Sequence, residues 1–123
     1  MTVDPPVLKR TPFYDYHVAA KAKMVPFGGF EMPVQYPAGI TREHEMVRTA
    51  VGVFDASHLG EFEVTGKDRN AFVNRLTSND VLALKEGQAQ YTALLTDDGT
   101  FIDDCLAYQF GDKIMLAVNA ANI

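Results

Sequence analysis

The chain has 123 residues, of which 47% are hydrophobic and 22% are charged, and its formal net charge at pH 7 is -5. These values are typical of one globular domain or less, and they exclude an intrinsically disordered chain. The negative charge argues against a surface that binds nucleic acid phosphates or an anionic membrane.

Targeting and redox signals favour a cytoplasmic location. The chain has no run of 18 apolar residues, so we expect no membrane span, and its N-terminal residues lack the apolar stretch of a secretory signal. The one cysteine, Cys105, excludes an internal disulfide and suits a reducing compartment. Its place in a strand pattern favours a small buried side chain over a catalytic thiol.

The N-terminal part of the chain predicts a helix followed by an extended segment. Residues 11–22 form the helix, with Thr11 as N-cap and Pro12 at the first helical position. Residues 24–37 contain three Pro and two Gly, which indicates a bent extended segment that turns at Gly28 and Gly29. The apolar side of the helix is expected to carry Tyr14, Val18 and Ala22.

The middle of the chain predicts two helices and a strand. Residues 40–52 give the clearest helix, which Gly52 ends. The second half of residues 53–66 alternates as a half-buried strand, and residues 67–80 predict another helix. The apolar stripe of the first of these helices holds Ile40, His44, Val47 and Val51. The inward residues of the second are expected to be Ala71, Phe72 and Leu76.

The C-terminal part of the chain predicts three strands, at residues 88–96, 100–110 and 113–119, joined by short turns. An antiparallel meander combined with helices defines the α+β class. Residues 24–37 and 114–119 are expected to pair with strands outside the chain. The sequence stops as a helix begins, so we expect a fragment of a longer protein.

Two adjacent acids, Asp103 and Asp104, interrupt the strand at 100–110, and they must point to opposite faces. The two faces are similarly apolar, so alternation leaves open which acid points inward. Tyr108 shares the face of Asp104, and Tyr91 on the preceding strand is a possible cross-strand neighbour. Such a wall could hold a polar ring, although a turn cap and a solvated edge residue would explain the pair as well.

The histidines are His17, His44 and His58, and their spacing fits no compact metal motif, so we expect no metal. His44 is expected to be a hydrogen-bonded core residue. Asp55, Ser57 and His58 superficially suggest a nucleophilic triad, but residues so close in sequence cannot easily form the relay. A structural role at this junction is the better interpretation.

Several stretches in order resemble one family, the glycine cleavage system T proteins, which are aminomethyltransferases. The resemblance covers Leu8 to Ile123, and its motifs are "GGFEMPVQY", "FDASHLGE", "GQAQYTALLTDDGTFIDD" and "VNAAN". The chain has Leu59 where the family usually has Met, Phe30 where Trp is usual, and Cys105 where Leu is common. None of these changes removes a proposed functional group.

The resemblance implies a fold and a reaction. Family members are roughly three times this length and fold as a three-domain cloverleaf around a folate. Residues 1–123 would then be an N-terminal fragment of the folate-binding region, inactive without the remaining domains. The implied reaction moves an aminomethyl group from the lipoyl arm of H protein to tetrahydrofolate. Its products are 5,10-methylenetetrahydrofolate, ammonia and the reduced lipoyl arm.

The resemblance also implies site residues. An acid of the "DD" motif lies near the reacting folate nitrogens, and we expect it to be Asp104, with Asp103 as second choice. Tyr91 and Leu59 match positions that line the folate cavity, and Asn119 is a weaker match. Alternation along the strand adds two further folate contacts, Leu106 and Tyr108.

Two other functions share the fold. One is a non-catalytic folate-binding protein, although such relatives generally lack the acid pair and carry a Lys-Gly-Cys motif. The other is a folate-dependent demethylating enzyme, whose flavin domain would precede this region. Whichever holds, exposed strand edges of a fragment are expected to cause self-association.

Overall fold

The computed structural model describes residues 7–123. The chain divides into two compact units, which we describe separately: unit 1 ends at His58, and unit 2 comprises Leu59–Ile123. No helix in the described part of the chain is long and apolar enough to cross a membrane.

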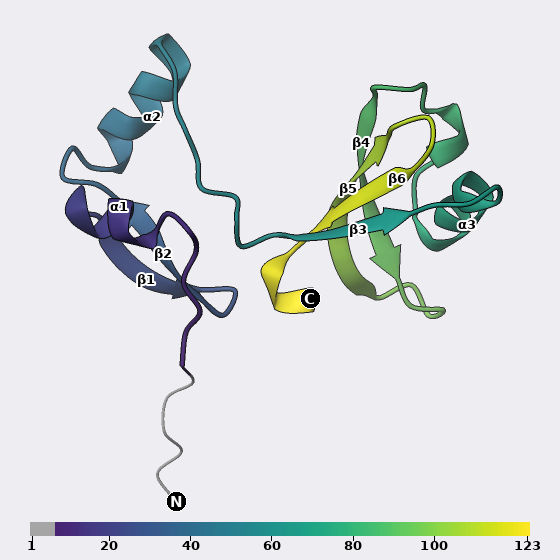
Figure 1. The fold of residues 1–123 in the computed structure, drawn as a ribbon, viewed down its shortest axis with the longest axis horizontal. Coiled ribbons are helices and arrows are strands. Elements are labelled where there is room, and N and C mark those ends of the chain that lie inside the picture. The colour runs from purple at the N-terminus through teal and green to yellow at the C-terminus, as the bar shows by residue number, and fades with distance from the viewer. Residues whose placement is uncertain (1–6) are drawn as a thin grey trace, which may run out of the picture. The chain divides into compact units, whose positions relative to one another are not determined.

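Unit 1 contains two helices and a β-hairpin (Figure 1). Gly28 and Gly29 both have positive φ, and they form the turn that pairs Phe27 with Phe30. The predicted turn is therefore confirmed, and the strands pair with each other. The elements are α1 (Tyr14–Ala19), β1 (Lys23–Phe27), β2 (Phe30–Gln35) and α2 (Ile40–Thr49).

The predicted orientation of α1 is wrong. His17 is its buried residue, whereas Val18 is 49% exposed. Thr11 does not act as the N-cap, because Phe13 occupies that position without a side-chain hydrogen bond. The Thr11 hydroxyl instead donates to Asp55. Long-range hydrogen bonds of polar side chains thus turn α1 away from the orientation that its apolar residues favour.

The helix α2 forms where predicted, but its apolar stripe is not buried in this chain. None of its residues is buried, and Ile40 and Val47 are 58% and 42% exposed. His44 is also exposed, so the expectation of a core histidine is wrong. Val51 lies beyond the last helical residue.

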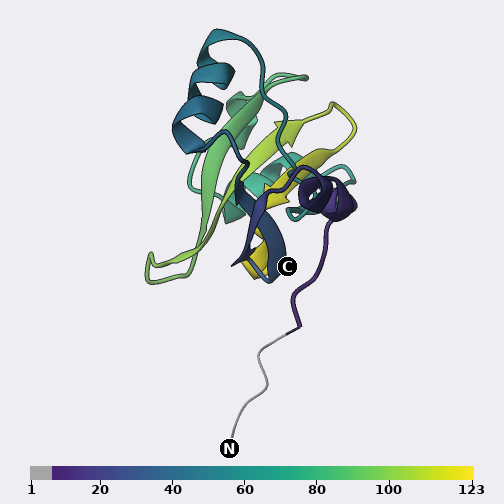
Figure 2. The same ribbon diagram turned by 90° about the vertical axis from the view of Figure 1, so that its left-hand side faces the viewer.

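Unit 2 is a four-stranded antiparallel sheet in the order β3-β6-β5-β4, as the α+β class requires. The turn between β4 and β5 projects beyond the sheet (Figure 2). The strands confirm the predicted ranges. They are β3 (Gly60–Val64), β4 (Ala89–Leu95), β5 (Phe101–Gln109) and β6 (Ile114–Val118), with helices α3 (Arg69–Leu76), η1 (Val81–Ala83) and η2 (Ala120–Asn122).

The strand β6 is central rather than an edge strand. It pairs with β3 from Val64 opposite Ile114 to Gly60 opposite Val118, and with β5 on its other side. The expectation that residues 114–119 pair outside the chain is therefore wrong. The edges of this sheet are β3 and β4.

The core of unit 2 lies on one face of the sheet, beneath α3 and η1. Val73 of α3 is fully buried, whereas Phe72 and Leu76 are 53% and 45% exposed, so the predicted inward residues of this helix are wrong. Asn74, next to Val73, accepts a hydrogen bond from the Val81 backbone N–H. The buried cluster comprises Val73, Val81, Cys105, Ala107, Ile114, Leu116 and Val118.

Candidate functional site

The register of β5 separates the two acids. Asp103 and Cys105 face the buried cluster and are 6% and 3% exposed. Asp104, one residue on, belongs to the opposite face, where Leu106 is 38% exposed. We call this second face the open face and define it by Tyr91, Asp104, Leu106 and Tyr108.

Strand pairing brings the predicted residues of the open face together. Tyr91 lies opposite Leu106, and Asp104 lies opposite Ala93, so Tyr91 and Asp104 are diagonal neighbours. The Tyr91 hydroxyl donates a hydrogen bond to Oδ2 of Asp104. This hydrogen bond, aided by burial, raises the pKa of the Tyr91 phenol. The predicted cross-strand proximity of Tyr91 to the acid-bearing strand is confirmed.

Asn119 lies immediately after β6 and contacts both acids. Its side-chain nitrogen is 2.8 Å from Oδ1 of Asp103, 3.1 Å from Oδ1 of Asp104 and 3.0 Å from the Asp104 carbonyl oxygen. Leu59 immediately precedes β3, one residue before Gly60 pairs with Val118. Extending that register by one residue places Leu59 beside Asn119, at the same end of the sheet as Asp104.

Asp103 is a buried carboxylate with three protein hydrogen-bond donors. Its Oδ2 accepts from the Asn119 backbone N–H at 3.0 Å, and its Oδ1 accepts from the Asn119 amide and the Asp104 backbone N–H. Burial alone would raise the pKa of Asp103, but hydrogen bonds from Asn119, Asn122 and Asp104 outweigh it, and the pKa is lowered. Asp103 is therefore an internal anion, whereas Asp104 lies on the open face.

Cys105 faces the same core, and burial followed by the charges of Asp103 and Asp104 raises the pKa of its thiol. A thiol with a raised pKa is a poor nucleophile at neutral pH. The interpretation of Cys105 as a buried small side chain is confirmed.

Unit 1 holds a second polar cluster, which sequence analysis missed. Asp55 accepts hydrogen bonds from Thr11 Oγ1 at 2.6 Å, His17 Nε2 at 2.9 Å and the Ser57 backbone N–H at 2.9 Å. Burial tends to raise the pKa of Asp55, but these hydrogen bonds hold it well below its usual range. The other ring nitrogen of His17 lies 2.8 Å from the Tyr36 hydroxyl.

This cluster also excludes a triad of Asp55, Ser57 and His58. Asp55 binds the Ser57 backbone and His17, while the His58 ring lies edge-on to Phe27, with ring centroids 5.6 Å apart. The structural interpretation of this junction is confirmed.

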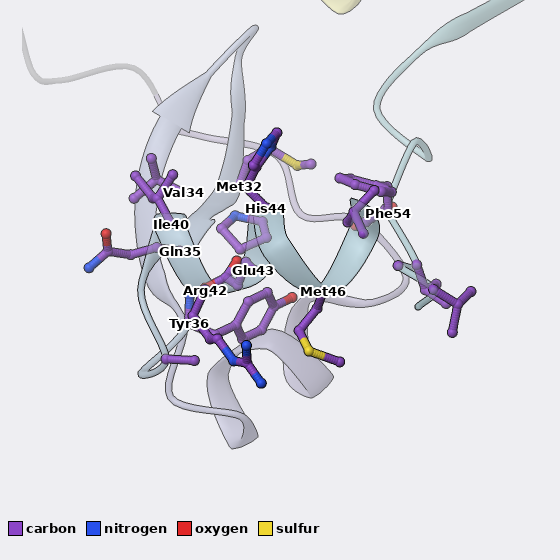
Figure 3. Close-up of a pocket in the computed structure, with 17 residues that line it drawn as sticks. Met32, Val34, Gln35, Tyr36, Ile40, Arg42, Glu43, His44, Met46 and Phe54 are labelled. Carbon is purple, nitrogen blue, oxygen red and sulfur yellow. Dashed lines mark hydrogen bonds between the residues drawn. The ribbon is translucent and has the colours of Figure 1, made fainter. Parts of the chain in front are cut away.

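An apolar groove of about 540 Å³ lies between β2 and α2 (Figure 3). Met32, Val47 and Phe54 contribute to its lining. Its polar groups are partly engaged, because Glu43 accepts a hydrogen bond from the Tyr36 backbone N–H at 2.7 Å. Within residues 7–123, no group of three or more His, Cys, Asp or Glu side chains is arranged to hold a metal ion.

The fold and the site define an α+β domain with an antiparallel sheet, one face covered by helices and the other carrying an acid with aromatic neighbours. A family model described as the GCVT N-terminal domain matches residues 13–123. The chain belongs to this family, as its motifs predicted.

Curated relatives support the same family assignment. The chain is 51% identical over 118 residues to an aminomethyltransferase of Bacillus subtilis (strain 168), and 53% identical over 117 residues to one of Chloroherpeton thalassium. These matches cover 95% and 94% of the chain but 32% of each relative. The chain thus spans about a third of the length of the curated relatives it matches.

A solved structure has the same fold. The glycine cleavage system aminomethyltransferase T from Bartonella henselae matches with a TM-score of 0.87 and 35% sequence identity. The match covers 94% of this chain and 32% of that one.

Proposed function

We propose that this chain is the N-terminal part of a tetrahydrofolate-dependent aminomethyltransferase. The whole protein would take the aminomethyl group from the lipoyl arm of H protein and yield 5,10-methylenetetrahydrofolate, ammonia and the reduced arm. Family membership and the names of the relatives support this activity. The structural observation that carries it is the Asp104 carboxylate, held by Tyr91 on the open face.

The chemistry of the open face fits a flat, polar folate ring. Tyr91 is 63% exposed and Leu106 is 38% exposed, so aromatic and aliphatic surface is available for packing. Asp104 adds a hydrogen-bond acceptor among these side chains. When bound, tetrahydrofolate supplies the nitrogen atoms that take up the one-carbon unit.

Each residue of the site would have a separate task. The Asp104 carboxylate accepts a hydrogen bond from an amine and stabilises positive charge that develops there. Tyr91 holds that carboxylate in place. Leu106, Tyr108 and Leu59 supply packing surface that excludes water, and Asn119 fixes the acids relative to each other.

The test is Asp104→Asn in the complete protein, with reduced-folate binding measured by calorimetry beside aminomethyl transfer. We expect folate to bind while turnover falls by roughly 10²-fold or more, the range of general acid–base effects. The stability of the variant should change by about 1 kcal/mol or less, because asparagine keeps one acceptor oxygen and the hydrogen bonds from Tyr91 and Asn119 are exposed. Asp97→Asn makes the same charge change at an exposed turn residue of the same hairpin and should leave turnover unchanged.

Two results would contradict the proposal. One is a wild-type protein that binds no reduced folate. The other is an Asp104→Asn variant that loses stability and turnover in equal measure, since Asp104 would then be a structural residue.

A further inference from the structure

The proposed reaction leaves one charged group of the site without a task. Asp103 is 6% exposed and faces the hydrophobic core, so it cannot take part through the open face. Burying a carboxylate is unfavourable unless several donors compensate, and an apolar residue would fill the same place at a lower cost in free energy. The presence of a charged group there needs an explanation beyond packing.

Besides a hydrogen bond from Asn122, the hydrogen bonds of Asp103 lead to the neighbourhood of Asp104. Its two oxygens accept from the backbone and side chain of Asn119 and from the Asp104 backbone N–H. The same Asn119 side chain lies 3.1 Å from Oδ1 of Asp104. Tyr91 binds the other oxygen of Asp104 from the neighbouring strand. Both oxygens of Asp104 are therefore held, and Asp103 fixes the group that holds one of them.

The backbone gives independent support, because the strand pairing is irregular next to the acid pair. The pairing of β4 with β5 shifts register between Leu94, which faces Asp103, and Leu95, which faces Phe101. Ile102 is thus an extra residue immediately before the acid pair. Such irregularities re-aim the side chains beside them and are frequent next to functional sites.

We propose that Asp103 is a positioning residue: its buried carboxylate fixes Asn119, and Asn119 orients the Asp104 carboxylate on the open face. Asp103 therefore acts through Asp104 and makes no contact with the ligand. This inference rests on the proposed function for its catalytic consequence, but the orientation of Asp104 can be measured without a ligand.

The experiment compares Asp103→Asn with wild type in the complete protein. Asparagine keeps the size of the side chain but removes the charge that holds the Asn119 amide. Turnover and reduced-folate affinity are measured together, and the titration of Tyr91 is followed by NMR of isotope-labelled tyrosine rings. The Tyr91 signal reports the orientation of Asp104, because their hydrogen bond is the largest cause that raises the pKa of the phenol; the charge of Asp103 is the smallest of the causes, so its removal alone should move the titration only slightly.

Thr92→Val is the matched control. Thr92 is a buried polar residue of the same sheet, 2% exposed, and its hydroxyl accepts a hydrogen bond from the Asn79 backbone N–H at 3.1 Å. This variant should lower the melting temperature without changing kcat or the Tyr91 titration. This control distinguishes a general loss of stability of the sheet from a specific effect on Asp104.

We expect Asp103→Asn to bind reduced folate within about threefold of wild type while kcat falls roughly tenfold to a hundredfold, as for a misplaced catalytic group. The Tyr91 titration should move to lower pH, towards that of an ordinary tyrosine. A second exchange, Asp103→Asn with Asn119→Asp, restores the contact between these two side chains but leaves Asp104 without its amide donor. The new carboxylate would also face the Asp104 oxygens that now accept from the Asn119 amide, so both kcat and stability should stay low.

The proposal is overturned if Asp103→Asn keeps the wild-type kcat and Tyr91 titration and loses only stability. It is also overturned if the double variant recovers kcat together with stability. A wild-type protein that binds no reduced folate would refute the proposed function alone. The Tyr91 titration would then still decide whether Asp103 positions Asp104.

Discussion

At the scale of single residues, Asp55 and Asp103 illustrate how a buried carboxylate stays ionised. Each is largely shielded from water, which favours the neutral acid, yet each accepts three hydrogen bonds from protein donors. In both, the donors prevail and the pKa is lowered. Part of the stability of each unit therefore depends on a charge inside it.

Asp55 gives unit 1 a predictable response to pH. A carboxyl group whose pKa is lower in the folded state stabilises the fold above its unfolded pKa of about 3.9, and this stabilisation disappears as the pH falls towards the folded value. Asp55→Asn should therefore destabilise unit 1 at pH 7 by about 1–3 kcal/mol. The difference from wild type should shrink as the pH drops below about 4.

Hydrogen exchange of the α1 and β2 amides between neutral and acidic pH measures this difference, because His17 and Tyr36 connect those segments to Asp55. Asp15→Asn, an exposed acid of α1, is the control and should give a difference that is small at every pH. An Asp55→Asn effect that stays constant down to pH 3 would contradict the assignment of the charge.

Part of the candidate site was predicted from the sequence. The resemblance pointed to Asp104, Tyr91 and Asn119, and the strand register brings these three together. The contact of His17 with Asp55 was not predictable, because 38 residues separate them and nothing in the "FDASHLGE" motif that holds Asp55 points to His17. Alternation along β5 also left open which acid points inward, since both faces of the strand carry apolar residues.

At the scale of elements, the strands were predicted more accurately than the helix faces. Turns at Gly99 and Gly111 separate the three C-terminal strands. Both residues have positive φ, which glycine adopts readily, so the glycines in the sequence indicate where the strands end. A helix face depends instead on what packs against it. In α3 the polar Asn70 and Asn74 accept hydrogen bonds from Gln109 and Val81, which turns Val73 inward.

The orientation of α3 can be tested by paired truncations. Val73→Ala removes two methyl groups from a fully buried site and should destabilise unit 2 by about 2 kcal/mol. Phe72→Ala removes a larger side chain that is 53% exposed and should cost less than about 1 kcal/mol. Urea unfolding followed at β5 and β6 amides measures both. If Phe72→Ala destabilises unit 2 more than Val73→Ala does, Phe72 faces the core, as the apolar pattern predicted, and the observed orientation of α3 is contradicted.

At the scale of the whole molecule, exposed apolar residues occur in both units, and three of the most exposed lie close together in unit 1. Val51, Val53 and Phe54 are 79%, 96% and 75% exposed, and they border the groove between β2 and α2. Single exposed apolar residues are ordinary, but a patch of neighbouring ones, here Val51, Val53 and Phe54, favours association. We therefore still expect the chain to self-associate, either through this patch or through the exposed strand edges.

We predict that the 123-residue chain associates reversibly as its concentration rises, and that Val53→Asp weakens this association. A charge in the patch opposes its burial, whereas the pairing of the β3 or β4 edges would be unaffected. Sedimentation velocity over a hundredfold range of concentration measures the effect. Val7→Asp, at another exposed valine of unit 1, is the control. If wild type stays monomeric throughout, the prediction fails; if Val53→Asp associates as strongly as wild type, the strand edges rather than the patch hold the copies together.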